Sequence, residues 1–221
     1  MSEKNTMTRS AMLFLPAKVL EGVLLLFMSA LYTHIFTETA AGTFGRVQQI
    51  SNFAYLLVAA WMANASTRYA AEEYKRDKAS GLLSTMTVVY LIMGGIGAAS
   101  CAVLAVVTGS TLYLPGIIMF CTYTAFTILI NMLVQLDRVK PAILFSLISA
   151  SLKLIVAVVL VGGKSNFPDP TPALAANIIA DGVGALGAAF ALGMPSAVRL
   201  RRASRAMLDK MLAYGVPLMG V

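Results

Sequence analysis

The sequence predicts an all-α polytopic membrane protein in which six transmembrane helices form one bundle, followed by the start of a seventh. The composition is the first reason. Of the 221 residues, 58% are hydrophobic and 12% are charged, and the mean hydropathy of +0.79 lies above that of soluble globular domains. The second reason is that apolar segments of about 20 residues, enough to cross a bilayer, recur along the chain. The third is that basic residues gather in alternate loops.

The elements follow in chain order from these segments. Residues 1–10 form a polar N-terminus on the cytoplasmic side. The apolar run after it exceeds the roughly 7–15 residues of a signal-peptide core, which makes it an uncleaved first span. A basic cytoplasmic loop is expected at 195–210, after a bundle over 11–194 that forms an N-terminal lobe. The six spans are expected at 11–35, 44–65, 82–108, 113–135, 141–162 and 172–194.

The last apolar stretch, MLAYGVPLMGV at 211–221, has only 11 residues. It is too short to cross a membrane alone. We therefore expect it to be the truncated start of a seventh transmembrane helix, and the sequence to be a fragment that stops inside that helix.

The basic residues predict the orientation, since short cytoplasmic loops are enriched in Lys and Arg. Between the spans, the loops on the side opposite the N-terminus contain one basic residue, Lys164. The spans or their edges hold three more. The other thirteen of the 17 lie on the N-terminal side: Lys4, Arg9, Arg68, Lys75, Arg76, Lys78, Arg138, Lys140, Arg199, Arg201, Arg202, Arg205 and Lys210. This asymmetry predicts a multi-pass protein with an even number of spans and a cytoplasmic N-terminus.

Five charged residues fall within or at the edge of the expected spans: Lys18, Glu21, Arg46, Lys153 and Asp181. A charge at the bilayer centre costs about 2.5–3.5 kcal/mol on insertion scales, so such residues usually face protein or a water-filled cavity. Two pairings would explain four of them, Lys153 with Asp181 between adjacent helices and Lys18 with Glu21 along one helix. Arg46 lies near the outer interface, where an arginine can also reach the headgroups.

Uncharged polar residues in the spans fall largely on helical stripes, because positions three, four or seven apart share a face. The stripes predict that a central cavity is lined by Gln49, Asn52, Asn131, Gln135 and Asn177. Polar side chains also hold membrane helices together, at about 0.6 kcal/mol each. That packing role is the alternative for any one of them.

The sequence contains no motif of an enzyme, a metal site or a phosphate-binding loop. We therefore expect no enzymatic activity, no cofactor and no metal. The basic residues are not interleaved with aromatic residues on a soluble surface, which argues against nucleic acid as a partner.

Three stretches resemble the polysaccharide-type flippases of the multidrug/oligosaccharidyl-lipid/polysaccharide exporter superfamily. They are LYTHIFTETAAGTFGRVQQI at 31–50, TRYAAEEYKR at 67–76 and LDKMLAYGVPLMGV at 208–221. The resemblance is one of pattern and order along the whole chain. It implies that the chain is the first of two six-helix bundles, with a second, C-terminal bundle absent from this sequence.

The resemblance also implies a location in the bacterial inner membrane. It implies a function there, the flipping of an undecaprenyl-pyrophosphate-linked oligosaccharide for surface polysaccharides such as O-antigen. Lys18 and Arg46 approximately match cationic cavity positions of that family, whereas Lys153 is added on its depth in the span alone. Glu21 and Asp181 are candidate ion-coupling residues or charge partners. Membrane lipids, a polysaccharide polymerase and glycosyltransferases are the further partners implied.

Two other functions remain open. A cation-coupled multidrug exporter of the same superfamily would use Asp181 or Glu21 as its central residue. A non-transporting membrane scaffold would recruit anionic lipids or a partner enzyme through basic loops at 66–80 and 195–210.

Overall fold

A computed structural model describes residues 3–77, 79–109 and 111–217, with side chains from residue 15 onward except those of residues 17 and 108. Within these ranges no β-strand occurs, and the only β-type pairing is an isolated bridge between Phe36 and Phe167. The all-α prediction is confirmed. The helices are α1 (Glu3–Ile35), α2 (Glu38–Ala54), η1 (Tyr55–Ala59), α3 (Ala60–Asp77), α4 (Ser80–Thr108), α5 (Tyr113–Gln135), α6 (Val139–Val161), α7 (Thr171–Leu192), α8 (Met194–Ala197), η2 (Leu200–Arg202) and α9 (Arg205–Gly215).

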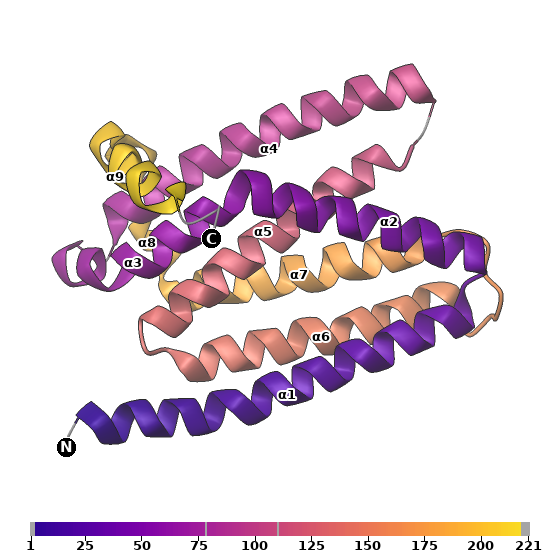
Figure 1. The fold of residues 1–221 in the computed structure, drawn as a ribbon, viewed down its shortest axis with the longest axis horizontal. Helices are drawn as coiled ribbons and strands as arrows, with labels where there is room; N and C mark the ends of the chain where they lie inside the picture. The colour runs from indigo at the N-terminus through magenta and orange to yellow at the C-terminus, as the bar shows by residue number, and fades with distance from the viewer. Residues whose placement is uncertain (1–2, 78, 110, 218–221) are drawn as a thin grey trace.

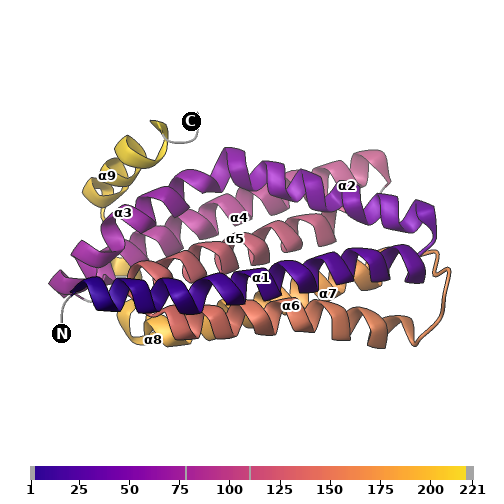
Figure 2. The same cartoon turned by 60° about the horizontal axis from the view of Figure 1, so that its bottom comes forward.

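The long helices lie side by side and run back and forth between two ends of one bundle (Figures 1 and 2). The start of α1 lies at the same end as the turns from α3 to α4 and from α5 to α6, and as α8 and α9. We call this the basic end, because these connections carry Arg138, Arg199 and Arg202. The connections from α1 to α2, α4 to α5 and α6 to α7 lie at the far end. The grouping of loops predicted from charge is thus also a grouping in space.

Five described helices are long and apolar enough to cross a membrane: Lys18–Ile35, Ser80–Val107, Tyr113–Gln135, Val139–Val161 and Thr171–Leu192. The chain is therefore an α-helical membrane protein by these criteria. Five of the six predicted spans meet these criteria.

The span that differs is the second, expected at 44–65. Here the chain forms one helical run from α2 through η1 into α3, but η1 is a π-helix that divides the run, and polar residues such as Arg46 and Asn52 lower its apolarity. The indole of Trp61 donates a 2.7 Å hydrogen bond to the Val58 carbonyl within the π-helix. A π-helix interrupts the regular backbone hydrogen bonds of an α-helix, and here the Trp61 side chain donates to one of the backbone carbonyls in the interrupted segment.

The core is built around α7, which packs against both α5 and α6. Small residues make this close approach possible. A β-carbon added to Gly184 would lie 2.6 Å from the Phe126 ring, and one added to Gly187 would overlap the Phe145 ring. By contrast, α4 has buried residues only in its first turns, up to Met86, and it diverges from the other helices toward the far end (Figure 1).

The chain after α7 departs from the predicted basic loop at 195–210 followed by a helix from 211. It forms α8, the short η2 and then α9, so the last helix begins at Arg205 instead. Met207 and Met211 of α9 are buried, and α9 packs on α3. Part of the predicted seventh helix, residues 218–221, lies outside the described residues.

The contact between α6 and α7 predicts a sharp difference between two glycine substitutions. Gly187→Ala should lower stability by about 1–3 kcal/mol, because the added methyl group overpacks against Phe145. Gly95→Ala on α4 is the matched control, since a β-carbon there meets nothing within 4 Å. Thermal unfolding of the purified protein in detergent measures both. Equal melting temperatures for the two variants would contradict this packing.

Candidate functional site

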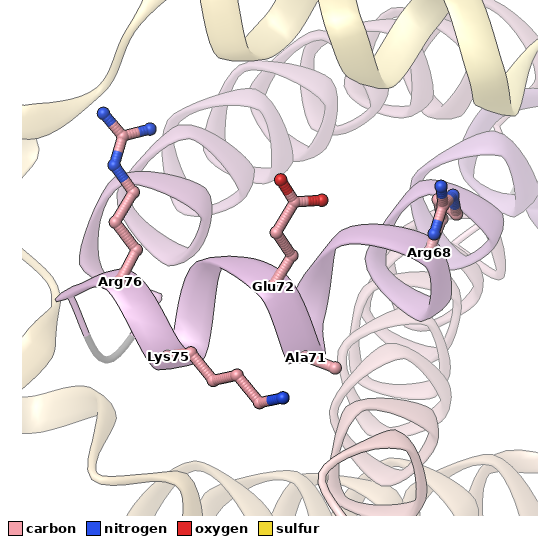
Figure 3. Close-up of a pocket in the computed structure, with 5 residues that line it drawn as sticks. All are labelled: Arg68, Ala71, Glu72, Lys75 and Arg76. Atoms are coloured by element: carbon pink, nitrogen blue, oxygen red, sulfur yellow. The ribbon is translucent and has the colours of Figure 1, made fainter.

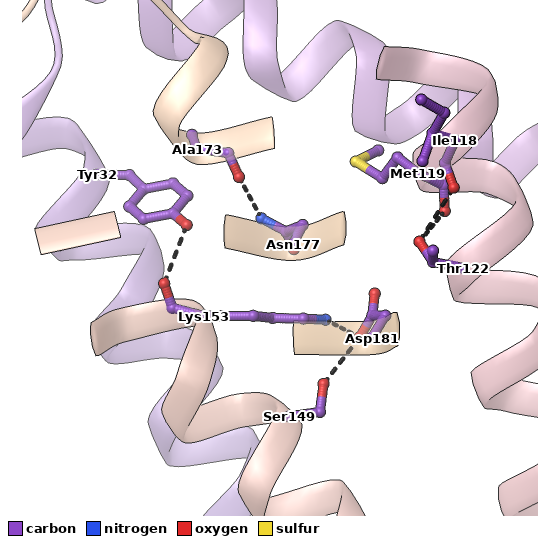
Figure 4. Close-up of polar contacts among 9 residues, drawn as sticks. All are labelled: Tyr32, Ile118, Met119, Thr122, Ser149, Lys153, Ala173, Asn177 and Asp181. Atoms are coloured by element: carbon purple, nitrogen blue, oxygen red, sulfur yellow. Dashed lines mark hydrogen bonds and ion pairs between the residues drawn. The ribbon is translucent and has the colours of Figure 1, made fainter. Parts of the chain in front are cut away.

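An ion pair joins α6 to α7 (Figure 4). The ammonium of Lys153 lies 2.8 Å from Oδ1 of Asp181, and their side chains are 13% and 3% exposed. The Ser149 hydroxyl donates a 2.8 Å hydrogen bond to the same carboxylate oxygen. Of the pairings considered from sequence, the one between adjacent helices is confirmed.

The helical repeat explains how these groups meet. Ser149 and Lys153 are four residues apart and share a face of α6, and Asn177 and Asp181 share a face of α7 in the same way. Asn177 is buried, and its amide donates a 2.9 Å hydrogen bond to the Ala173 carbonyl of its own helix (Figure 4). From α1, the Tyr32 hydroxyl donates to the Lys153 carbonyl at 3.5 Å. The predicted polar faces of α6 and α7 therefore face each other.

A second ion pair forms along α1, where Lys18 lies 2.7 Å from Oε2 of Glu21. It is more open than the first, with side chains 43% and 18% exposed. The pairing expected from the i, i+3 spacing is thus present.

Both lysines line one pocket of about 280 Å³ between α1, α5 and α6. Its wall combines the charges of Lys18, Glu21 and Lys153 with hydroxyl and amide groups, and aromatic rings cover part of it. The other lining residues are Leu25, Tyr123, Phe126, Thr127, Ile130, Asn131, Ser146, Ser149 and Ala150. We call this the central pocket. It brings together four of the residues predicted as a site, Lys18, Glu21, Asn131 and Lys153.

The charges at the central pocket balance. Lys18 pairs with Glu21, and Lys153 pairs with Asp181, so the two lysines and two carboxylates sum to zero. The expected cavity was cationic. An anion that binds here therefore has to compete with a carboxylate for each ammonium group.

The remaining predicted residues lie elsewhere. Arg46 is exposed on α2 and lines a larger, mostly apolar groove of about 740 Å³ between α2, α4 and α5. Gln49, Asn52 and Gln135 are exposed and do not line the central pocket. The predicted face of the second span thus points away from the stripes of α1, α5 and α6.

Two aromatic residues of the central pocket were not predicted. Tyr123 and Phe126 lie on α5 beside Thr127 and Asn131. Tyr123 is four residues before Thr127, so the stripe of polar residues on α5 already indicated its face. Aromatic residues within an apolar span give no other signal in a sequence.

Another hollow, of about 540 Å³, is open and lies on the surface of α3 at the basic end (Figure 3). Its five residues, Arg68, Ala71, Glu72, Lys75 and Arg76, all come from one helix. Its basic residues, Arg68, Lys75 and Arg76, belong to the basic segment predicted at 66–80.

Within the described residues, no group of three or more His, Cys, Asp or Glu side chains could hold a metal ion. Comparison with known proteins found no significant match to a family model, a curated protein or a solved structure.

The buried ion pair makes a prediction about stability. Asp181→Leu should destabilise the protein by about 3–5 kcal/mol, because it leaves the Lys153 ammonium buried without its partner. The double variant Lys153→Met with Asp181→Leu should recover most of that loss, because no charge then remains between α6 and α7.

Thermal unfolding of the single and double variants measures this coupling. The same cycle on Lys18 and Glu21 is the control and should show weaker coupling, since that pair is more exposed. Additive effects of the two substitutions at 153 and 181 would argue against an ion pair.

Proposed function

We propose that this protein is a transporter, and that it flips an undecaprenyl-pyrophosphate-linked oligosaccharide across the bacterial inner membrane. The central pocket is the observation that supports this most. Two lysines from different helices, Lys18 and Lys153, line one cavity of a helical membrane bundle together with hydroxyl and amide groups. A pyrophosphate needs such groups, because an unpaired ion in a low-dielectric interior costs many kcal/mol.

The balanced charges suggest how the pocket works. When no anion is bound, Glu21 and Asp181 compensate the lysines. A pyrophosphate entering the pocket replaces these carboxylates as the partner of the ammonium groups. When it leaves, the carboxylates take their place again, so that neither state leaves a lysine of the pocket unpaired.

In this proposal the run of α2, η1 and α3 also crosses the membrane, as a sixth span. It extends from the far end to the basic end of the bundle in both views (Figures 1 and 2). The basic end then faces the cytoplasm, in keeping with its arginines. Alternating access also requires a second bundle that moves against this one.

A cation-coupled exporter is the second candidate. It is favoured by the carboxylates at the site, since Asp181 is 3% exposed and binds both Lys153 and Ser149. Protonation of such a carboxylate would release its lysine. That release is a route for coupling to an ion gradient.

Charge reversal separates these functions. Lys18→Glu in the cells that carry the protein should reduce surface polysaccharide about tenfold or more, because a hydrogen bond to a charged group contributes about 1.5–3 kcal/mol. Quantification of the polysaccharide and of drug susceptibility in the same cells measures the effect. Lys164→Glu, in the connection between α6 and α7, is the matched control and should change neither.

Two other combinations of polysaccharide level and drug tolerance would support other functions. Lost drug tolerance with normal polysaccharide would favour the exporter. Unchanged polysaccharide and drug tolerance, with the protein present in the membrane, would favour a scaffold in which the polar residues only hold helices together.

A further inference from the structure

We propose that the basic end contains a binding site for one anionic phospholipid of the membrane. Its headgroup phosphate occupies a hollow of about 430 Å³ formed where α3, α4, α7, α8 and η2 meet. We call this hollow the headgroup site. The inference does not depend on the proposed translocation, because none of the residues that line the headgroup site lines the central pocket.

The headgroup site has an excess of positive charge. Arg138, Arg199 and Arg202 line it, and Asp77 is the one carboxylate among its lining residues. Arg202 lies 3.8 Å from Asp77, which leaves a net charge of two positive units. A basic hollow at the end of membrane helices is a typical place for an anionic headgroup.

The arginines differ in how they are used. Arg138 donates hydrogen bonds to two neutral groups, the Ala191 carbonyl and, at 2.5 Å, the Tyr74 hydroxyl, and its guanidinium lies over the Tyr74 ring. The Arg199 side chain has no ion pair or hydrogen bond to the described residues and is exposed. Arg138 thus supports the wall, whereas Arg199 is available to a ligand and Arg202 is held only by its 3.8 Å contact with Asp77.

The backbone that carries Arg199 and Arg202 is held in place by α4. The buried Ser80 hydroxyl donates a 2.6 Å hydrogen bond to the Ala197 carbonyl. The Arg199 amide donates to the Ser84 hydroxyl at 3.0 Å, and the Ser204 amide donates to the Thr85 hydroxyl at 3.1 Å. A site whose backbone is already fixed loses less entropy when a ligand binds.

An apolar stripe on α7 explains why the ligand is a lipid. Phe190, which lines the headgroup site, is 70% exposed. It ends a row of exposed apolar residues on one face of α7, together with Ile179, Val183 and Leu186. Since α7 is long and apolar enough to cross a membrane, this row lies along acyl chains. A phospholipid is the ligand that offers a phosphate to the hollow and a chain to the stripe.

Two charge-matched double variants test the site. Arg199→Gln with Arg202→Gln removes two arginines that line the hollow, and Arg201→Gln with Arg205→Gln removes two from the same segment that do not. Purified full-chain protein is mixed with phosphatidylglycerol and phosphatidylcholine in detergent, and retained lipid is counted by native mass spectrometry. Thermal unfolding without added lipid checks that each variant is folded.

We expect the wild type to retain one phosphatidylglycerol in preference to phosphatidylcholine. The first double variant should lose this preference by roughly tenfold or more, since each arginine near a membrane surface contributes about 1 kcal/mol. The second double variant should keep it. Phe190→Gln should weaken retention of phosphatidylglycerol, because it removes an apolar contact for the acyl chain. In the wild type, the soluble headgroup glycerophosphoglycerol should compete poorly with phosphatidylglycerol.

Three results would overturn the proposal. Equal loss in both double variants would mean that lipid senses only the overall charge of the basic end. Full retention in the first double variant would mean that the hollow is not the site. Effective competition by glycerophosphoglycerol would mean that the hollow binds a soluble anion instead of a lipid.

Discussion

The ion pair between Lys153 and Asp181 is the most buried ion pair in the described residues, and the centre of the bundle depends on it. Both side chains are nearly buried, and either charge alone would be costly at that depth. The pair therefore fixes how α6 is placed along α7, with Ser149 adding a hydrogen bond at the same carboxylate. The same side of α6 also borders the central pocket, which Ser146, Ser149 and Lys153 line together with residues of α1 and α5.

The small residues of α7 are the steric counterpart of this electrostatic constraint. Gly184 and Gly187 allow aromatic rings of α5 and α6 to approach the helix closely. The ion pair can span from α6 to α7 because the helices are this near. The helices at the periphery pack less closely. No described residue of α4 beyond Met86 is buried, and the π-helix η1 interrupts the helical run of α2 and α3.

The sequence was sufficient to predict the helical membrane fold and much of the central pocket. A charge within an apolar span has a high free-energy cost, which marked Lys153 and Asp181 as candidates. Helical spacing then predicted that Ser149 shares a face with Lys153 and that Asn177 shares a face with Asp181. The interruption of the second span could not be predicted, because a π-helix depends on packing around Tyr55–Ala59 and not on composition. Arg46 could not be placed either, since spacing gives the face of a helix but not which neighbour that face meets.

The central pocket and the headgroup site have separate roles in this account. The central pocket has balanced charges inside the bundle, and the headgroup site has an excess of positive charge at the basic end. The arginines of the basic end suit a membrane surface. The lysines of the central pocket are functional only if water and a charged ligand can reach them.

Access of water to the central pocket is therefore the most direct test of the account. In a variant with Cys101 and Cys121 replaced by serine, a cysteine at Asn131 would be treated with a charged, water-soluble thiol reagent. We predict that it reacts, whereas a cysteine at the exposed apolar residue Ile118 of the same helix does not. No reaction at position 131, in protein that reacts normally after unfolding, would contradict a hydrated pocket and leave its polar residues as helix contacts.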